Sequence, residues 1–433
     1  MTGLAVGIDL GTSGVRSAVV DAAGKPLSFA RSSYGGPEDS RDPACWWQAV
    51  TQCMRAQISA LEDNDISPTD IRSIAVDGTS GTLVLVDKTH NPVTHALMYS
   101  DGGFDAEASK ISRHAPDPHI TRGSASALAR AMYLVAKDGD GRAAHLLHQA
   151  DFIAAKLRGT GAVSDVNNAL KTGCDPAQAT WPDWIGALLP VQLLPDLVSP
   201  GTEVGPVSSQ VSDEFGLPRQ TMIHAGTTDS IAAFLAATPP KPGAAVTSIG
   251  TTLAIKLFSH KRIDAPEMGL YAHRLGEGWL VGGASNTGGG VLRAHFSDAK
   301  LVTLSAQIDP TQSSGLDYYP LLKPGERFPI NDPCLPPRLT PRPANDAAFL
   351  HGIFDGIARI EHQAYTLLKE HGAEWPQLIL TAGGASRNPV LTQIRERVLK
   401  LPVEAAAEVE AAVGTAKLAL TSGRTFSSEI PKT

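Results

Sequence analysis

The sequence predicts an α/β protein with two related domains, and three observations support this class. The chain has 433 residues, more than one ordinary domain, so two domains are expected. Apolar runs of strand composition alternate with segments that have the apolar spacing of a helix. Two distant segments, 4–20 and 246–257, share one pattern: an apolar strand, a small turn with Gly and Thr, and a second apolar strand. We therefore expect each half of the chain to begin with such a hairpin, and a cleft to lie between the halves.

The composition indicates a globular protein and excludes several functional classes. Hydrophobic residues make up 42% of the chain and charged residues 19%, and the formal net charge is −7 with both signs dispersed. A nucleic-acid-binding protein usually carries a basic patch, so no nucleic-acid partner is expected. No apolar run approaches the roughly 20 residues that span a membrane, and the N-terminus lacks the pattern of a signal peptide. The cysteines form no CxxC pair and no disulfide framework, so we expect a cytoplasmic protein with no membrane partner.

The first element is a strand-turn-strand unit. Residues 4–9 and 15–20 have strand composition, and Gly11 and Gly14 lie in the turn between them. No GK[ST] follows and no helix begins at this turn, so the unit is not a P-loop. Glycines let the backbone approach a ligand closely, and successive N–H groups in such a turn form a concave site for anions.

Asp9 ends the first strand of this unit, close in sequence to the hydroxyl groups of Thr12 and Ser13. The hydroxyl groups add hydrogen-bond donors to the turn, which favours phosphate binding. A carboxylate there would repel phosphate unless a cation lay between them, so the pattern implies Mg²⁺. A plain hairpin turn with a structural aspartate is the alternative. Similar patterns at 74–87 and 246–257 bring the two interpretations to near equality.

Helical apolar spacing occurs in three segments of the first half, 46–61, 126–136 and 148–158. His145 and His148 are three residues apart on what reads as a helix. Metal binding would need a third ligand, and none is evident, so both histidines are expected at the surface or between the domains.

The segment 220–237 predicts a strand, a turn of small residues and an apolar helix. Asp229 precedes the helix and has two interpretations: an N-cap residue, or a general base at the tip of an element that faces the cleft. Asp77, Asp101 and Asp165 are further acidic candidates, although each is more often a turn or cap residue than a ligand.

Prolines and a glycine directly after this helix predict the domain boundary. The two domains would comprise residues 1–238 and 239–433. In the second domain, residues 309–345 hold many prolines and are expected to run over the surface. Residues 347–371 have helical spacing.

Residues 378–400 predict a strand, a glycine turn and a helix near the end of the chain. Asn388 suits the helix cap, and Pro389 suits the first helical turn. No Cβ projects from Gly383 or Gly384, so the turn could admit a flat heterocycle. A tight join between strand and helix is the alternative.

Together, these segments resemble the FGGY carbohydrate kinases, a family within the superfamily of sugar kinases, actin and heat-shock chaperone ATPases. The resemblance covers nearly the whole chain. Its markers, in chain order, are GIDLGTSGVRSAVVD, DPACWW, VDGTSGTLVLVD, MYSD, SDVNNALKTGCDP, HAGTTDSIAAFLAA, SIGTT, GGASRNP and EAAVGTAKLAL. It implies two related actin-like (ribonuclease H-like) α/β domains with an interdomain cleft. The chain looks most similar to the compact ribulokinase-like and xylulokinase-like branch, including D-ribulose kinases, and SDVNNALKTGCDP suggests this most.

The resemblance also implies roles for individual residues. The first domain would bind the sugar and the phosphates, and the second the nucleotide. Asp229 would take the proton from the attacking sugar hydroxyl, and Asp9 would orient Mg²⁺ or the reacting phosphate through water. The turns that flank the ATP phosphates would be formed by Gly11, Thr12, Ser13, Gly250, Thr251 and Thr252. The adenosine would be lined by Gly383, Gly384 and Asn388. The sugar would be contacted by Ser80, Asp77, Thr79 and Asp101.

Two positions depart from the family pattern. The family often has an arginine two residues after the aspartate of the MY-x-D segment, where this chain has Gly103. A tryptophan is common after the aspartate of the HQAD segment, where this chain has Phe152. Both positions are expected to touch or approach the sugar, so the departures bear on the identity of the sugar and not on phosphoryl transfer.

The resemblance therefore implies an ATP-dependent sugar kinase that phosphorylates a terminal hydroxyl of a ketopentose, with D-ribulose as the first choice. D-xylulose, or a polyol such as glycerol or erythritol, is the alternative within the same class. A non-catalytic ATP-binding protein, actin-like or chaperone-like, is the alternative from another class, and Asp229 in its TTDS context favours the kinase. The cofactors would be ATP and Mg²⁺, and the protein would be a monomer or a homodimer.

Overall fold

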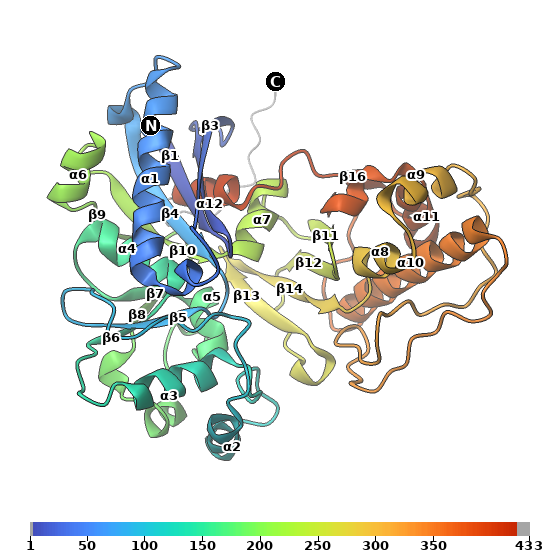
Figure 1. The fold of residues 1–433 in the computed structure, drawn as a ribbon, viewed down its shortest axis with the longest axis horizontal. Coiled ribbons are helices and arrows are strands. Elements are labelled where there is room, and N and C mark those ends of the chain that lie inside the picture. The colour runs from blue at the N-terminus through green and yellow to red at the C-terminus, as the bar shows by residue number, and fades with distance from the viewer. Residues whose placement is uncertain (1–2, 422–433) are drawn as a thin grey trace. The chain divides into compact units, whose positions relative to one another are not determined.

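The computed structural model describes residues 3–421, apart from the side chains of residues 385 and 386. Within this range the chain forms two compact units, each built on a six-stranded sheet with helices packed on it (Figure 1). Unit 1 contains the chain up to Ala236, the segment His273–Gly276 and the chain from Glu408. Unit 2 contains Ala237–Ala272 and Glu277–Ala407. The predicted α/β class is confirmed.

The sheet of unit 1 has the strand order β3-β2-β1-β4-β10-β9, and β1, β4 and β10 run parallel to one another. The predicted hairpin of β1 and β2 is confirmed. Alternate side chains of β1 point to opposite faces, so Val6 and Ile8 lie in one core and Ala5 in another. The strands are β1 Leu4–Leu10, β2 Gly14–Val20, β3 Pro26–Ser33, β4 Ile71–Gly78, β9 Glu203–Pro206 and β10 Met222–Thr228.

One face of this sheet is covered by α1 (Pro43–Glu62) and α4 (Gln149–Arg158). Asp42 caps α1 by accepting a backbone N–H of the first turn, which satisfies one of the donors that a helix start leaves open. Trp46 of α1 packs edge-on against Phe152 of α4, with ring centroids 6.0 Å apart. Both rings are buried in the core that the apolar face of the sheet completes.

The other face is covered by α12 (Ala411–Ala419), which packs against β1 and β4 although it lies near the end of the chain (Figure 1). Small residues permit this approach, since a Cβ on Gly7 would lie 1.9 Å from the carbonyl oxygen of Ala412. By its contacts α12 belongs to unit 1, whereas the sequence placed it in the domain of residues 239–433. The predicted limits of the two domains, and the separate roles of the domains, stay predictions.

The second GTSG segment differs from the first in its pairing. After β4 and its turn, β5 (Leu83–Val86) pairs with β6 (His145–His148) and not with β4. The reason is that β1 and β10 already occupy the two edges of β4. Residues 74–87 therefore resemble the first hairpin in sequence, but the two strands on either side of their turn do not pair with each other.

His145 and His148 do not lie on a helix. They are the first and last residues of β6, and α4 begins directly after them. His148 is buried, and its ring nitrogens lie 2.7 Å from a carboxylate oxygen of Asp151 and 3.0 Å from the hydroxyl of Thr172. The predicted surface or interdomain position of His148 is therefore wrong. Two apolar residues between two histidines fit a strand and a helix equally well, so spacing alone could not distinguish them.

The sheet of unit 2 has the order β13-β14-β12-β11-β15-β16, and the predicted hairpin of β11 and β12 is confirmed. The core helix α10 (Asp346–Glu370) carries Glu361, which forms a buried ion pair of 2.7 Å with Arg395 of α11 (Pro389–Leu399). The strands are β11 Ala245–Ile249, β12 Leu253–Ser259, β13 Tyr271–Leu275, β14 Gly278–Ser285, β15 Ile379–Ala382 and β16 Val403–Ala405.

The remaining elements are short. They are α2 Asp105–His114, α3 Ala127–Lys137, α5 Val166–Ala169, α6 Ser209–Phe215, α7 Asp229–Ala237, α8 Gly289–His295, α9 Asp298–Ser305 and the paired strands β7 Val163–Asp165 and β8 Asp196–Val198. The predicted helices at 46–61, 126–136 and 347–371 are confirmed, and residues 309–345 form neither an α-helix nor a named strand. Across residues 3–421, no helix has both the length and the apolar composition to cross a membrane.

Candidate active site

Three carboxylates lie at one edge of the unit 1 sheet. Asp9 is the second-last residue of β1 and Asp77 the second-last residue of β4, and the strand register pairs them directly. Asp229 follows β10 immediately and is the first residue of α7. Because β1, β4 and β10 are adjacent and parallel, their carboxyl ends meet at one edge, which is where open α/β sheets bind ligands. The structure thus brings together three of the predicted acidic residues.

Asp77 is fully buried, and its surroundings disfavour its charge. Burial and then the charge of Asp9 raise the pKa of the Asp77 carboxyl well above its usual value, and the charge of Asp229 adds to this. Thr415 of α12 donates a hydrogen bond to Asp77 Oδ2, which favours the charged form. Within the described residues, Asp77 Oδ1 has no hydrogen-bond partner. A buried polar oxygen without a partner is costly, so Oδ1 marks a place where a ligand atom could bind.

Asp9 is also buried, and burial raises the pKa of its carboxyl, whereas its interactions with the side chains of Asp77 and Arg16 oppose this. Arg16 is the partner of Asp9 across the β1–β2 hairpin, and its Nη1 lies 3.4 Å from Asp9 Oδ2. Arg16 was not predicted from the sequence. Counting the register back from the hairpin turn would have placed it opposite Asp9.

The turn between β1 and β2 exposes the side chains of Thr12 and Ser13. The N–H of Gly11 donates to the carbonyl of Gly14 at 3.0 Å, which closes the turn. A Cβ on Gly14 would lie 2.3 Å from the carbonyl oxygen of Ser32, so this position accepts only glycine without a shift of the backbone. The predicted phosphate-binding turn is thus a tight hairpin with two exposed hydroxyl groups.

The acidic edge of the sheet fits a Mg²⁺ ion shared with a ligand better than a metal ion held by protein side chains alone. Among residues 3–421, no three His, Cys, Asp or Glu side chains are arranged to hold a metal ion by themselves. Mg²⁺ is commonly bound through one or two carboxylates and completes its shell with waters and substrate phosphates. Asp9 with Asp77 beside it therefore suits Mg²⁺ that is shared with a phosphorylated ligand, and not a permanently held metal.

The turn after β4 holds Thr79 and Ser80. The hydroxyl of Thr79 is hydrogen-bonded to Thr82 at 2.6 Å and to the side-chain oxygen of Gln149 at 2.9 Å, so it is used within the protein. The Oγ of Ser80 is buried and has no partner among the described residues. Together with Asp77 Oδ1, Ser80 Oγ forms a pair of unused polar atoms within four residues of the chain.

Asp101 is fixed by two arginines that sequence reasoning missed. Arg41 holds its carboxylate with two hydrogen bonds of 2.7 Å, and this pairing lowers the pKa of Asp101. Arg130 is buried and donates to the carbonyls of Asp101 and Gly81, so it ties the two loops together. Burial lowers the pKa of Arg130 to about 10. No local pattern marks these arginines, because their partners lie far away in the sequence.

Asp165, the remaining acidic candidate, has a different place. It is the last residue of β7 and caps α5, with its Oδ1 accepting the N–H groups of Asn167 and Asn168. Burial and the nearby charge of Asp151 raise the pKa of Asp165 to about 7. It is a cap residue, as the alternative interpretation had it, and it supports neighbouring side chains.

The two departures from the family pattern also differ from each other in the structure. Phe152 is 1% exposed and packs on Trp46 in the core, so it serves packing there, and its approach to the sugar stays a prediction. Gly103 has a φ of +87°, and a Cβ there would have nothing within 4 Å. It lies two residues after Asp101, in a loop with open space around it.

In unit 2, the turn at Gly250, Thr251 and Thr252 joins β11 to β12. The N–H groups of Gly289 and Gly290 donate to the carbonyls of Gly250 and Thr251, both at 2.9 Å, so the start of α8 supports this turn. A Cβ on Gly250 would have nothing within 4 Å, which leaves room beside the turn.

Gly383 lies against the end of β11. Its φ is +86°, and a Cβ there would lie 2.7 Å from the carbonyl oxygen of Ile249, so glycine is required. Gly384 has open space around it. Asn388 caps α11 and also donates to Ser305 Oγ at 2.9 Å. The structure brings the Gly250 and Gly383 turns together, while contact of these residues with a nucleotide stays a prediction, as does joint action with the Gly11 turn of unit 1.

Known proteins match the chain along almost its whole length. Residues 4–236 match the N-terminal domain of the FGGY family of carbohydrate kinases, and residues 245–422 match the C-terminal domain of the same family. The xylulose kinase of Bacillus subtilis is 23% identical, with 92% of this chain and 85% of that protein aligned. The xylulose kinase of Streptomyces coelicolor is 25% identical, with 93% and 84% aligned. The solved xylulose kinase of Rhodospirillum rubrum has a TM-score of 0.83 at 22% identity, over 97% of this chain and 90% of that one. This match confirms the predicted two-domain fold type.

Proposed function

This chain belongs to the FGGY family of carbohydrate kinases and is an ATP-dependent sugar kinase, and we propose that it phosphorylates a terminal hydroxyl group of a ketopentose. The observation that carries the proposal is the placement of Asp229 beside Asp9 and Asp77, at the ends of three adjacent parallel strands. A kinase of this kind needs a carboxylate that accepts the hydroxyl proton, next to groups that manage the charge of phosphate.

Asp229 is the proposed general base. It is half-buried at the start of α7, and its charge helps to raise the pKa of the Asp77 carboxyl. Its carboxylate would accept the proton of the sugar hydroxyl as that oxygen attacks the terminal phosphate of ATP. Phosphoryl transfer demands little covalent chemistry from a protein, so the placement of this carboxylate matters more than its strength as a base.

Asp9 is the proposed Mg²⁺ residue, acting through water. The raised pKa values of the Asp9 and Asp77 carboxyls indicate negative charge that the protein alone compensates poorly, which fits a cation here. When bound, Mg²⁺ would neutralise charge on the phosphate oxygens. Arg16, hydrogen-bonded to Asp9, would keep that carboxylate oriented.

The sugar is proposed to bind at the turn after β4. Asp77 Oδ1 and Ser80 Oγ are buried without partners, and sugar hydroxyl groups would supply them. Thr79 would act by fixing the turn, since its hydroxyl is already bound to Gln149. Asp101, held by Arg41, would present its carboxylate in a constant orientation.

The nucleotide is proposed to bind in unit 2. Gly250, Thr251 and Thr252 would face the phosphates from that unit, and Gly11, Thr12 and Ser13 would do so from unit 1. Gly383 and Gly384 would lie along the adenosine, and Asn388 would line it while it caps α11. The absence of a side chain at Gly250 and Gly384, each with open space around it, supports this placement.

Two ketopentoses are the first substrates to compare. The segment SDVNNALKTGCDP suggests the compact ribulokinase-like and xylulokinase-like branch, which includes D-ribulose kinases. The relatives named above are xylulose kinases, which favours D-xylulose. A polyol such as glycerol or erythritol is the further alternative.

The test is ADP release by the 433-residue chain with Mg·ATP and a panel of D-ribulose, D-xylulose, L-ribulose, L-xylulose, glycerol, erythritol and the matching aldoses. Release with one ketopentose far above the others would support the proposal and identify the sugar. Release only with a polyol would contradict the acceptor class. ATP binding without release from any acceptor would favour a non-catalytic ATP-binding protein.

A further inference from the structure

The strand that leads to Asp229 is interrupted just before it. On β10, His224 pairs with Ala75 of β4 and Thr227 pairs with Asp77, so two residues of β10 lie opposite the single residue Val76. This extra residue is a β-bulge, a device that re-aims the chain and is frequent near active sites. At the bulge a Cβ on Gly226 would lie 1.7 Å from the carbonyl oxygen of Val76, so the two backbones are in close contact. The ladder between β10 and β4 is therefore interrupted at Ala225 and Gly226 and resumes at Thr227, two residues before Asp229.

Two buried asparagines of α5 hold the chain immediately after the bulge. Asn168 Nδ2 donates to the carbonyl oxygen of Thr227 at 3.1 Å, and Asn167 Nδ2 donates to Thr227 Oγ1 at the same distance. Thr227 is therefore held by hydrogen bonds at both its backbone and its side chain, an arrangement called the grip below. It lies two residues before Asp229, and all three residues of the grip are buried.

The asparagines are themselves held in place. Asp165 accepts both their backbone N–H groups, and its Oδ2 accepts Asn168 Nδ2 at 2.6 Å. Asn167 Nδ2 also donates to the carbonyl oxygen of Arg274 at 2.8 Å. The hydrogen bonds thus run from Asp165 through Asn168 to Thr227, and the backbone leads from Thr227 to Asp229 two residues later.

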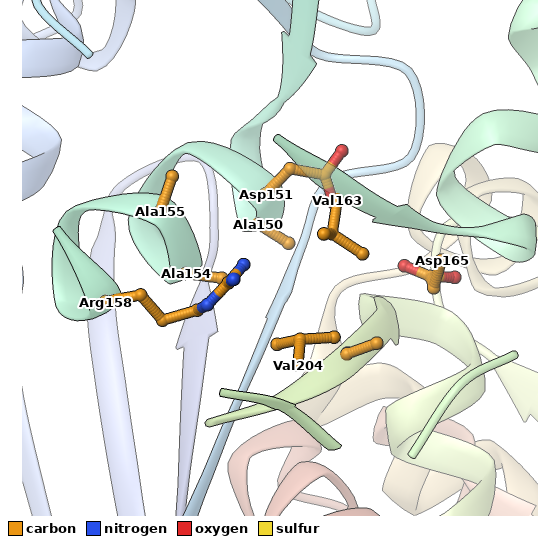
Figure 2. Close-up of a pocket in the computed structure, with 10 residues that line it drawn as sticks. Ala150, Asp151, Ala154, Ala155, Arg158, Val163, Asp165 and Val204 are labelled. Carbon is orange, nitrogen blue, oxygen red and sulfur yellow. The ribbon is translucent and has the colours of Figure 1, made fainter. Parts of the chain in front are cut away.

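A small cavity lies beside the bulge. It has a volume of about 10 Å³, room for about one water molecule. Figure 2 shows its lining: Arg158 and Asp151 come from α4, Asp165 from β7, and Val204 from β9. Ala225 and Gly226, the bulged residues, complete it. The side-chain hydrogen bonds that hold the next residue, Thr227, come from Asn167 and Asn168 of α5.

We propose that Asn167 and Asn168 are positioning residues that aim Asp229, acting through the bulged end of β10. The proposal rests on the proposed role of Asp229 as the base. Neither asparagine is placed in contact with the sugar or the nucleotide. Loss of the grip would let Thr227, and with it the start of α7, shift by a fraction of an ångström to about 1 Å. A misplacement of that size can cost about 10²-fold in rate.

The first test compares Asn168→Ala with Gln57→Ala as a matched control. Gln57 is another fully buried amide of unit 1, bonded to Ser17 and Ser28 and not to the β10 end. Asn168→Ala is expected to lower kcat by about 10²-fold while KM for the sugar and for ATP changes less than about threefold. Gln57→Ala is expected to lower the melting temperature with kcat nearly kept. An equal loss of kcat in both variants would overturn the proposal, because the loss would then follow stability alone.

The second test asks whether Asn168 acts through Asp229. In an Asp229→Asn background, Asn168→Ala should reduce the residual rate less than about threefold, since the base that it aims is already gone. A further loss near 10²-fold would show an effect independent of Asp229 and overturn the proposal. Asn167→Ala and Thr227→Val should likewise be non-additive with each other, because they remove the same hydrogen bond.

The third test needs no activity and so separates this inference from the proposed function. Hydrogen exchange of the full chain should become faster at the amides of residues 227–230 in Asn168→Ala, and unchanged exchange there would overturn the proposal. The wild-type chain could phosphorylate no acceptor while hydrogen exchange at residues 227–230 was still faster in Asn168→Ala. The role of Asp229 as base would then be refuted, but the role of Asn168 in holding the segment before Asp229 would be supported.

Discussion

Thr415 donates a hydrogen bond to the carboxylate of Asp77, although 338 residues separate them in the chain. The contact exists because glycines and alanines let α12 approach β1 and β4 at backbone distance. It joins the end of the chain to the acidic edge of the sheet near its beginning.

The Thr415 contact should contribute to stability. Thr415→Val keeps the shape of the side chain but removes the hydrogen bond that Thr415 donates to a buried carboxylate, which should cost roughly 1–3 kcal/mol in the free energy of unfolding. Urea unfolding measures this. Thr366→Val, which removes a hydroxyl bonded only to its own helix, is the control and should change stability little. Equal effects of the two substitutions would contradict the importance of the Asp77 contact.

Replacement of the proposed base should affect turnover more than binding. Asp229→Asn is expected to lower kcat by roughly 10²–10⁴-fold, since a general base typically contributes that much, with ATP binding largely kept. Asp298→Asn is the matched control, because Asp298 is also the first residue of a helix but lies in the exposed α9. Normal turnover in a folded Asp229→Asn protein would refute the assignment.

The role of Asp9 should appear in the dependence on magnesium. Asp9→Ala removes the proposed anchor of the ion, so the activity that depends on Mg·ATP should be lost or should need much more Mg²⁺. Titration of activity with Mg²⁺ at fixed ATP measures this. An unchanged Mg²⁺ dependence would count against the assignment.

Ser80→Ala should weaken the binding of sugar without loss of stability. The Oγ of Ser80 has no partner among the described residues, so its removal costs the folded protein nothing. Loss of one hydrogen bond to the sugar is worth about 0.5–1.5 kcal/mol, which corresponds to a rise in KM of about 2- to 13-fold. KM for ATP should not change. An unaltered KM for the sugar would place the acceptor elsewhere.

Stability should depend on pH through Asp165. Its pKa is raised to about 7 from the ordinary 3.8, so the folded protein keeps a proton there that the unfolded chain loses. The resulting stabilisation is fully present below pH 3.8 and is lost as the pH rises through about 7. Between pH 5 and pH 8 the loss should be roughly 2–3 kcal/mol, at about 1.4 kcal/mol per pH unit. Asp165→Asn cannot titrate, so the free energy of unfolding of this variant should fall less over that interval; equal slopes for both proteins would contradict the raised pKa.

The local features of this protein were determined by its sequence alone. The hairpins of β1–β2 and β11–β12 follow from alternating apolar residues around small turns, and the helix cap at Asn388 follows from residue type. The family likeness and the candidates Asp9 and Asp229 were also readable, because each depends on a short motif.

Only the tertiary structure decided which of these residues meet. Strand order, which no single segment encodes, pairs Asp9 with Asp77 and leaves no edge of β4 free for β5. Contacts such as Thr415 with Asp77 and Asn168 with Thr227 join residues far apart in the chain. A local pattern is set by periodicity and turn chemistry, whereas such contacts arise from the packing of whole elements, and packing depends on the entire chain at once.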